Sequence, residues 1–181
     1  TFGSECARFL LEHDFIPVDL IPAYDSLTQD LIQRVAWCYK RCPNLKLIRT
    51  HGDCHRGNIL WTEAGPHMVD LDDSRMAPAV QDLWMFLSGE REDCEQTLHM
   101  VLEGYTLFTD FDPAELNLIE ALRTLRLMHY FAWIARRWND PAFPRAFPWF
   151  NTARSWEQHI LDLREQVALM DEPPLTWQAV R

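Results

Sequence analysis

Lysine is scarce in this sequence: of its 17 basic residues only Lys40 and Lys46 are lysines. Against 27 acidic residues this leaves a formal net charge of −10. Such a balance argues against a nucleic-acid-binding surface, because those surfaces need clustered positive charge. Glycine is also scarce, and the six glycines form no G-x-G-x-x-G pattern. A glycine-rich nucleotide loop is therefore absent from the sequence.

Cysteine pairs and long apolar segments are missing too. The five cysteines are odd in number and contain no C-x-x-C spacing, which argues against a disulfide framework and favours a reducing compartment. No apolar run approaches the roughly 18 residues that a membrane-spanning helix needs. We therefore expect a cytoplasmic protein without a membrane or nucleic-acid partner.

The remaining pattern predicts a mainly α domain with a small β-hairpin, an α+β fold class. At 181 residues the chain has the length of one domain. Apolar residues recur at helical spacing in several long segments. The expected helices run from Cys6 to Leu11, from a capping box at Ser26 to Cys42, over 79–87, over 92–108, from Asp112 to Trp138, and from Trp156 to Met170.

Three local signals carry more specific expectations. Asp112-Pro113 followed by Glu115 combines an N-cap, proline at the first helical position and glutamate at the third. Prolines and aromatics over 139–150 predict a packed loop, and Pro173-Pro174 predict the end of the ordered chain.

Polar side chains gather in the stretch 51–73, between short apolar runs. Residues 58–61 and 67–71 read as two strands joined by a glycine-containing turn over 62–66. A hairpin returns its chain ends to one place, so Asp53 and Asn58 at one end can approach Asp70 at the other. Carboxylate and amide oxygens suit a hard cation such as Mg²⁺, and a carboxylate can also serve as a general base.

The spacing within this stretch is typical of phosphoryl transfer. Asp53 and Asn58 are five residues apart, as in the kinase catalytic loop H-R-D-x-x-x-x-N, with Gly52 in place of the arginine. Asp70 follows an apolar strand, where the metal-binding aspartate of D-F-G belongs. Asp72 and Asp73 depart from that motif, since they stand where Phe and Gly are expected.

The motif HGDxxxxN with a Val-Asp strand end resembles the aminoglycoside phosphotransferase and choline kinase superfamily, which has a protein-kinase-like fold. Within it, the sequence is most similar to the bacterial stress response kinases. The segments that carry this likeness are HGDCHRGNILW, VDLDDSR, APAVQDLWMFL and RRWNDPAFPRAFPWF. The resemblance runs from about Asp25 to Pro174, and together these segments are a specific signature.

The resemblance implies a division of roles. Asp53 is expected to be the catalytic base, and Asn58 and Asp70 are expected to bind magnesium. His51 is expected to brace the loop, and Asp82 to tie it down from the following helix. The roles of His55 and Asp72 stay open. ATP is the implied phosphoryl donor, and a Ser/Thr side chain of a protein in the stress response is the implied acceptor.

The resemblance also explains what is missing. A kinase-like enzyme needs a glycine-rich loop and a strand lysine that contact the phosphates. Lys40 is expected at the end of a helix and Lys46 at the start of the strand just before the motif, so neither lies on an N-terminal sheet ahead of it. Residues 1–181 are therefore expected to form a C-terminal catalytic lobe without its N-terminal nucleotide lobe. Such a piece by itself should bind ATP poorly and be nearly inactive.

Three alternatives remain open from the sequence. The acceptor could instead be a small hydroxyl compound, as in aminoglycoside or choline kinases. His51, Asp53 and His55 alternate, so with His67 they could form the metal site of a hydrolase. The chain could also belong to a non-catalytic binding module, an alternative that gains weight only if the full-length protein also lacks the phosphate-binding lysine. Separately, Arg136-Arg137 could be a solvated face or an anchor for acidic groups.

Overall fold

The computed structural model of the chain describes residues 2–178. These divide into two compact units. The first ends at Cys38 and resumes over Glu120–Glu172, and the second comprises Tyr39–Ile119 with the segment that starts at Pro173. The boundaries fall near the end of helix α2 and at the start of helix α5. Each unit is described by itself.

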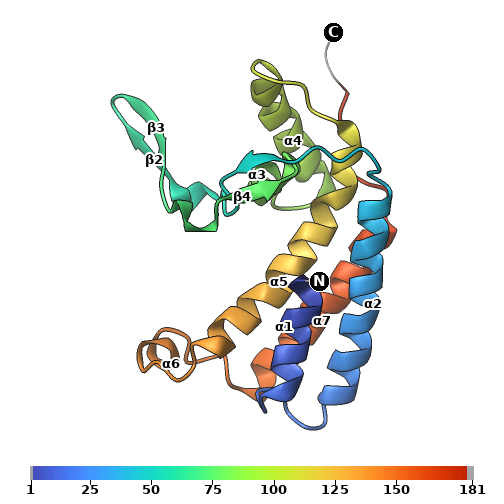
Figure 1. Cartoon of the computed structure of the whole chain (residues 1–181), viewed down its shortest axis with the longest axis vertical. Coiled ribbons are helices and arrows are strands. Elements are labelled where there is room, and N and C mark those ends of the chain that lie inside the picture. Colours follow the sequence, from blue (N-terminus) through green and yellow to red (C-terminus); the bar gives the residue numbers. More distant parts are fainter. Residues whose placement is uncertain (1, 179–181) are drawn as a thin grey trace. The chain divides into compact units, whose positions relative to one another are not determined.

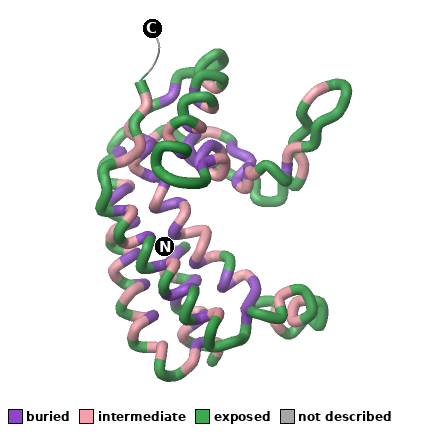
Figure 2. The backbone as a smooth tube through the Cα atoms, turned by 180° about the vertical axis from the view of Figure 1, so that it is seen from behind, coloured by how far each residue is buried: buried purple, intermediate pink, exposed green. Residues whose placement is uncertain are grey.

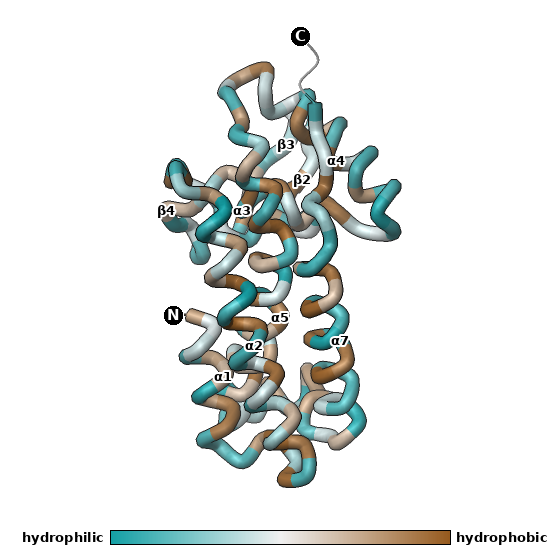
Figure 3. Tube along the Cα trace, turned by 90° about the vertical axis from the view of Figure 1, so that its right-hand side faces the viewer, coloured by the Kyte–Doolittle hydropathy of each residue, from teal (hydrophilic) through white to brown (hydrophobic). Residues whose placement is uncertain are grey.

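The first unit is helical. Its long helices run side by side (Figure 1; Figure 3), and their apolar stripes alternate with hydrophilic turns, as expected for helices that share a core. The bounds are α1 Phe2–Glu12, α2 Ile21–Lys40, α5 Ile119–Arg136, α6 Ala142–Ala146 and α7 Ala153–Asp171.

Aromatic rings form much of the core of this first unit. His159 of α7 stacks on Phe131 of α5, with ring centroids 3.6 Å apart and planes inclined by 11°. Tyr24 of α2 and Trp156 of α7 lie 6.1 Å apart in an edge-on arrangement. Neither ring has measurable exposure to solvent. Burial of side chains this large contributes roughly 2–3 kcal/mol each, so these contacts are the main link between α2, α5 and α7.

The second unit combines short helices with two antiparallel strand pairs. Strand β1 pairs with β4 so that Thr50 faces Arg75, and β2 pairs with β3 so that Thr62 faces Gly65. The second pair is exposed along most of its length (Figure 2). The bounds are β1 Ile48–Thr50, β2 Ile59–Thr62, β3 Gly65–Met68, β4 Arg75–Ala77, α3 Val80–Leu83 and α4 Arg91–Thr106.

The predicted class is confirmed: the chain is mainly α with a small antiparallel β component. The predicted hairpin is present, but its second strand is Gly65–Met68 rather than 67–71, and its turn is only the two residues Glu63-Ala64 rather than 62–66. The predicted N-cap at Asp112 is also present, since its carboxylate accepts a hydrogen bond from Ala114 N–H at 2.9 Å. That helix begins as a 3-10 helix over Pro113–Leu118 and becomes α-helical at Ile119.

Three local predictions were wrong. Helix α2 begins at Ile21, because proline is tolerated in a first turn and Pro22 therefore continues the helix. Ser26 thus lies inside it rather than at a cap. The expected loop over 139–150 contains the short helix α6. The chain stays anchored at Pro173, whose carbonyl oxygen accepts a hydrogen bond from Arg91 Nη1 at 3.0 Å.

Within residues 2–178 no helix combines the length and apolar character needed to cross a membrane.

The buried imidazole of His159 makes the first unit sensitive to acid. Burial lowers the pKa of His159 from 6.5 to about 3, because the charged ring would lose its hydration. As pH falls below 6.5 the unfolded chain therefore takes up the proton first. The free energy of unfolding should therefore decrease by about 1.4 kcal/mol for each unit by which the pH falls between the two pKa values, 6.5 and about 3.

Urea unfolding of the protein at pH 7.0, 6.0, 5.0 and 4.5 measures this dependence. His159→Phe keeps an aromatic ring on Phe131 and should flatten the decline, whereas His99→Phe, at an exposed position of α4, should retain the wild-type profile. An unchanged pH dependence in His159→Phe would contradict the assignment.

Candidate active site

The loop after β1 turns sharply at Gly52. Its φ angle is +87°, a left-handed conformation that side chains other than glycine rarely adopt. A Cβ atom here would lie 2.1 Å from the carbonyl oxygen of Asp73. The close approach of the two backbones therefore requires glycine. It accounts for the difference from H-R-D, because an arginine cannot occupy this position.

Asp82 holds the two backbone amides of this turn. Its Oδ2 accepts a hydrogen bond from His51 N–H at 2.6 Å, and its Oδ1 accepts one from Gly52 N–H at 2.9 Å. Asp82 belongs to α3, whose first amide, Val80 N–H, donates to the buried Glu115 carboxylate at 2.9 Å. Burial raises the pKa of Glu115, and its backbone hydrogen bonds oppose that shift.

The carbonyl of Gly52 is held from the other side. Its oxygen accepts hydrogen bonds from Gln81 Nε2 at 3.1 Å and from Arg75 Nη2 at 3.2 Å. The peptide units around Gly52 are thus fixed at both their N–H and C=O groups. Sequence reasoning missed Arg75, Gln81 and the contact that Glu115 makes with α3. Each is a common polar residue outside the central motif, and its partner is a backbone group distant in sequence.

His51 links the loop to the hairpin. Its Nε2 lies 2.8 Å from the carbonyl oxygen of Val69. A carbonyl can only accept, so Nε2 carries the proton and Nδ1 is an acceptor. Asp53 N–H donates to that Nδ1 at 3.4 Å. One imidazole therefore bridges the backbone of Asp53 and the residue before Asp70.

Asn58 and Asp70 lie at the same end of the hairpin. Val69 N–H donates to Asn58 C=O at 3.0 Å. The Asn58 amide nitrogen donates to the Asp53 carbonyl at 3.0 Å, which leaves its side-chain oxygen as the atom for a cation. Asp70 is exposed and has φ 61° and ψ 62°. Non-glycine residues adopt this left-handed conformation rarely, and it often marks a functional position.

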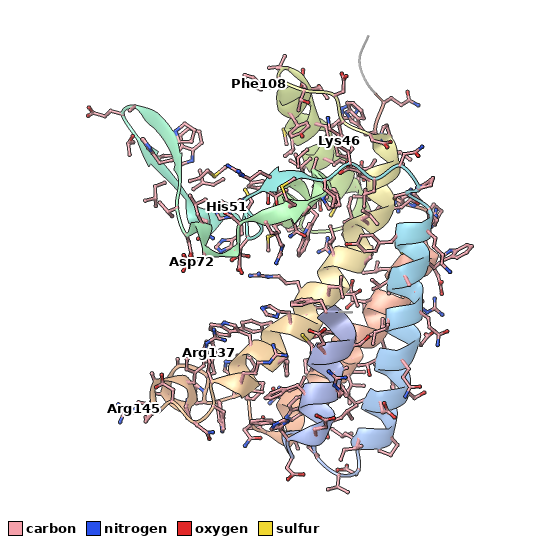
Figure 4. The ribbon with its side chains drawn as sticks, viewed as in Figure 1. Lys46, His51, Asp72, Phe108, Arg137 and Arg145 are labelled. Carbon is pink, nitrogen blue, oxygen red and sulfur yellow. The ribbon has the colours of Figure 1, made fainter. Side chains whose placement is uncertain are left out.

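The side-chain oxygens of Asn58 and Asp70 suit a magnesium ion that is bound to a nucleotide. Mg²⁺ in such sites takes one or two protein oxygens, and phosphate oxygens and water supply the rest. Asn58 and Asp70 offer an amide and a carboxylate oxygen from adjoining backbone positions. Asp72 lies in the 3-10 helix Leu71–Asp73 and is exposed. In Figure 4 its side chain extends away from the ribbon near the segment that carries His51, and its role stays open.

His55 stands beside Asp53. Its Nδ1 accepts a hydrogen bond from Gly57 N–H at 3.0 Å, so in the neutral ring Nε2 carries the proton. That Nε2 lies 3.7 Å from Asp53 Oδ2, which is longer than a hydrogen bond. The Asp53 side chain is 15% exposed. The Nε2–H group of His55 therefore lies near the Asp53 carboxylate without forming a hydrogen bond to it.

Cys54, between these two residues, is an unsuitable nucleophile. Burial, with the nearby charges of Asp82 and Asp53, raises the pKa of its thiol to about 11. Because the thiolate is the reactive form, the side chain stays protonated and inert near neutral pH.

The arrangement does not support the hydrolase alternative. The His51 ring is engaged with backbone groups, and His67 lies 3.0 Å from Thr62 Oγ1 within the hairpin. Across residues 2–178 no three His, Cys, Asp or Glu side chains are grouped as a metal site would require.

Several bacterial proteins named as kinases are similar to this chain in sequence. The chain is 46% identical over 160 residues to stress response kinase A of Escherichia coli K12. It is 44% identical over the same length to the serine/threonine protein kinase RdoA of Salmonella typhimurium and to stress response kinase A of Shigella flexneri. Each alignment covers 88% of this chain and 48% of the relative. The chain thus spans about half the length of these curated relatives.

A broader family match covers the segment that contains the site. The profile of the phosphotransferase enzyme family matches residues 11–119, which include the loop at Gly52, the hairpin and Asp82. The predicted resemblance is confirmed, and the chain belongs to the phosphotransferase enzyme family, whose members include kinase-like enzymes.

Proposed function

We propose that this chain carries the catalytic base and metal-binding side chains of an ATP- and Mg²⁺-dependent kinase that transfers phosphate to a hydroxyl group. One observation carries the proposal. The loop at Asp53 is fixed by Asp82, Gln81 and Arg75, and Asn58 bonds the Asp53 backbone. This support holds one carboxylate and two potential metal ligands within a single loop and hairpin.

Each group has a defined task in the proposed reaction. The carboxylate of Asp53 orients the acceptor hydroxyl and accepts its proton as the oxygen attacks the γ-phosphorus. The bond from that phosphorus to the bridging oxygen breaks, and ADP leaves. Asn58 and Asp70 would hold Mg²⁺, and when bound the ion would supply positive charge beside the phosphates. His55 directs its Nε2–H toward the Asp53 carboxylate.

The nucleotide-binding groups come from elsewhere in this proposal. Kinase-like enzymes hold the phosphates with a glycine-rich loop and a strand lysine. The sequence has no such loop, and Lys40 and Lys46 are both exposed. The relatives are about twice as long as the matched region. We therefore assign the chain to the C-terminal catalytic lobe of a longer protein.

The proposed acceptor is a Ser or Thr side chain of a protein. The support is the similarity to a relative named serine/threonine protein kinase and to relatives named stress response kinase. A small hydroxyl compound is the competing acceptor. In the full-length protein with labelled ATP, a panel of Ser/Thr-containing proteins should be phosphorylated, and aminoglycosides and choline should not.

Replacement of the proposed base tests the chemistry. Asp53→Asn is isosteric and cannot accept a proton, so the transfer rate of the full-length protein should fall by about 10²- to 10⁴-fold, the usual contribution of a general base. Nucleotide affinity should change little. Asp110→Asn, an exposed carboxylate in the same unit, is the control. Unchanged turnover in Asp53→Asn would remove Asp53 as the base.

Replacement of the proposed metal ligand tests the cofactor. Asp70→Ala removes a carboxylate oxygen, so the Mg²⁺ concentration for half-maximal activity of the full-length protein should rise by at least tenfold. Because alanine also tolerates the left-handed backbone poorly, Asp70→Asn serves as a second variant that tolerates this conformation. A Mg²⁺ dependence identical to wild type in both variants would contradict the ligand role.

A further inference from the structure

The charge of the chain is unevenly distributed. Between Glu120 and Glu157 the sequence has six arginines and one acidic residue, Asp140, although the whole chain has a net charge of −10. Arg123 forms an ion pair with Glu120, and the Asp140 carboxylate accepts a hydrogen bond from Ala142 N–H. The remaining arginines give this stretch of the sequence a net positive charge.

A set of aromatic rings lies in the same region. Tyr130 stacks on Trp133 and on Trp149, with ring centroids 6.2 and 6.4 Å apart. Phe147 contacts all three rings edge-on. Unlike the core rings around His159, these four are only partly buried, and Tyr130 and Trp149 are 38% and 42% exposed. The four rings therefore form a cluster at the surface and do not belong to the core.

Arg137 contacts one of these rings, and Arg145 lies two residues before Phe147 in the sequence. The Arg137 guanidinium lies 4.8 Å from the centroid of Trp133, and Figure 4 shows it at the end of α5 with Arg145 on the adjacent helix α6. Both side chains are exposed. Among the described residues neither arginine forms an ion pair with a carboxylate. Arg136 differs, since its guanidinium lies over Phe9 of α1.

We propose that this aromatic–arginine surface, formed by Tyr130, Trp133, Arg137, Arg145, Phe147 and Trp149, is a docking site for an acidic segment of another protein. The exposed guanidinium groups match carboxylates, which they bind through paired hydrogen bonds. Tyrosine, tryptophan and arginine supply most of the binding energy at protein interfaces. The rings add flat apolar area beside the charges, so acidic residues next to aromatic or aliphatic ones fit this surface best.

The same observations disfavour a nucleic acid as the partner. Nucleic-acid binding draws on many phosphate contacts and a broad basic surface. Here one exposed arginine contacts a ring, a second exposed arginine lies on helix α6, and the chain as a whole is acidic. The residues of this surface all belong to the first unit, and none of them belongs to the loop at Asp53.

Selection from peptide pools by the full-length protein tests this inference. One pool holds 12-residue peptides built from Asp, Glu, Tyr, Phe, Leu, Ser and Gly, and a matched pool has Asn and Gln in place of Asp and Glu. Peptides retained by the immobilised protein are identified by mass spectrometry, and the best are measured by fluorescence anisotropy. The acidic pool should yield binders at least tenfold tighter than the neutral pool, with affinity that falls as salt rises.

Variants then locate the site. Arg145→Glu alters a side chain that forms no ion pair within residues 2–178, and it should weaken binding at least tenfold when combined with Arg137→Glu. Trp149→Ala should weaken it as well. Arg164→Glu on α7 and Trp37→Ala on α2 are matched exposed controls and should bind within twofold of wild type. Thermal melts check that each variant is folded. If the Arg137→Glu, Arg145→Glu double variant does not fold, Arg145→Gln alone replaces it.

Three results would overturn the inference. The first is that the protein retains peptides of the acidic and neutral pools equally well, or retains peptides of neither pool. The second is affinity that is unchanged in Arg145→Glu and Trp149→Ala. The third is tighter binding of a single-stranded oligonucleotide than of any acidic peptide.

Discussion

The hydrogen bonds that the Asp82 carboxylate accepts from two successive backbone amides are the constraint on which the candidate site depends. A loop with a left-handed glycine at its apex has many accessible conformations, and folding must restrict them. One carboxylate that accepts from both His51 and Gly52 fixes the direction in which the chain enters Asp53. Charge-assisted bonds of this kind are stronger than those between neutral groups.

The position of Asp82 is itself fixed by elements distant in sequence. Asp82 is placed by α3, and the first amide of α3 is bound by Glu115. On the opposite side His51 connects the loop to the carbonyl before Asp70. The base and the proposed metal ligands therefore share one network of backbone contacts. A change in α3 or in the hairpin would therefore affect the proposed proton acceptor and the proposed metal ligands together.

Much of this was predictable because short-range patterns determine it. The spacing of Asp53, Asn58 and Asp70, the glycine-containing hairpin and the N-cap at Asp112 are local signals, and the structure has the hairpin and the cap where they were expected. The helix start near Ser26 was mispredicted, because its apparent capping box competes with an equally acceptable start that places Pro22 in the first turn.

The contacts of Arg75, Gln81 and Glu115 could not be predicted. Their partners are backbone groups more than 20 residues away, and a backbone group leaves no signature in sequence. The doublet Arg136-Arg137 shows the same limit. Sequence left its role open, whereas the structure separates the two side chains onto Phe9 and Trp133.

Amide hydrogen exchange at Gly52 tests the central claim most directly. In the wild-type protein this N–H bonds a carboxylate of a helix 30 residues away, and it should exchange slowly although it lies in a loop. In Asp82→Ala the exchange of His51 and Gly52 should accelerate by at least tenfold, while the amides of α4 stay protected. Equal exchange of these two amides in both proteins would show that the loop holds its conformation without Asp82, and would contradict the account.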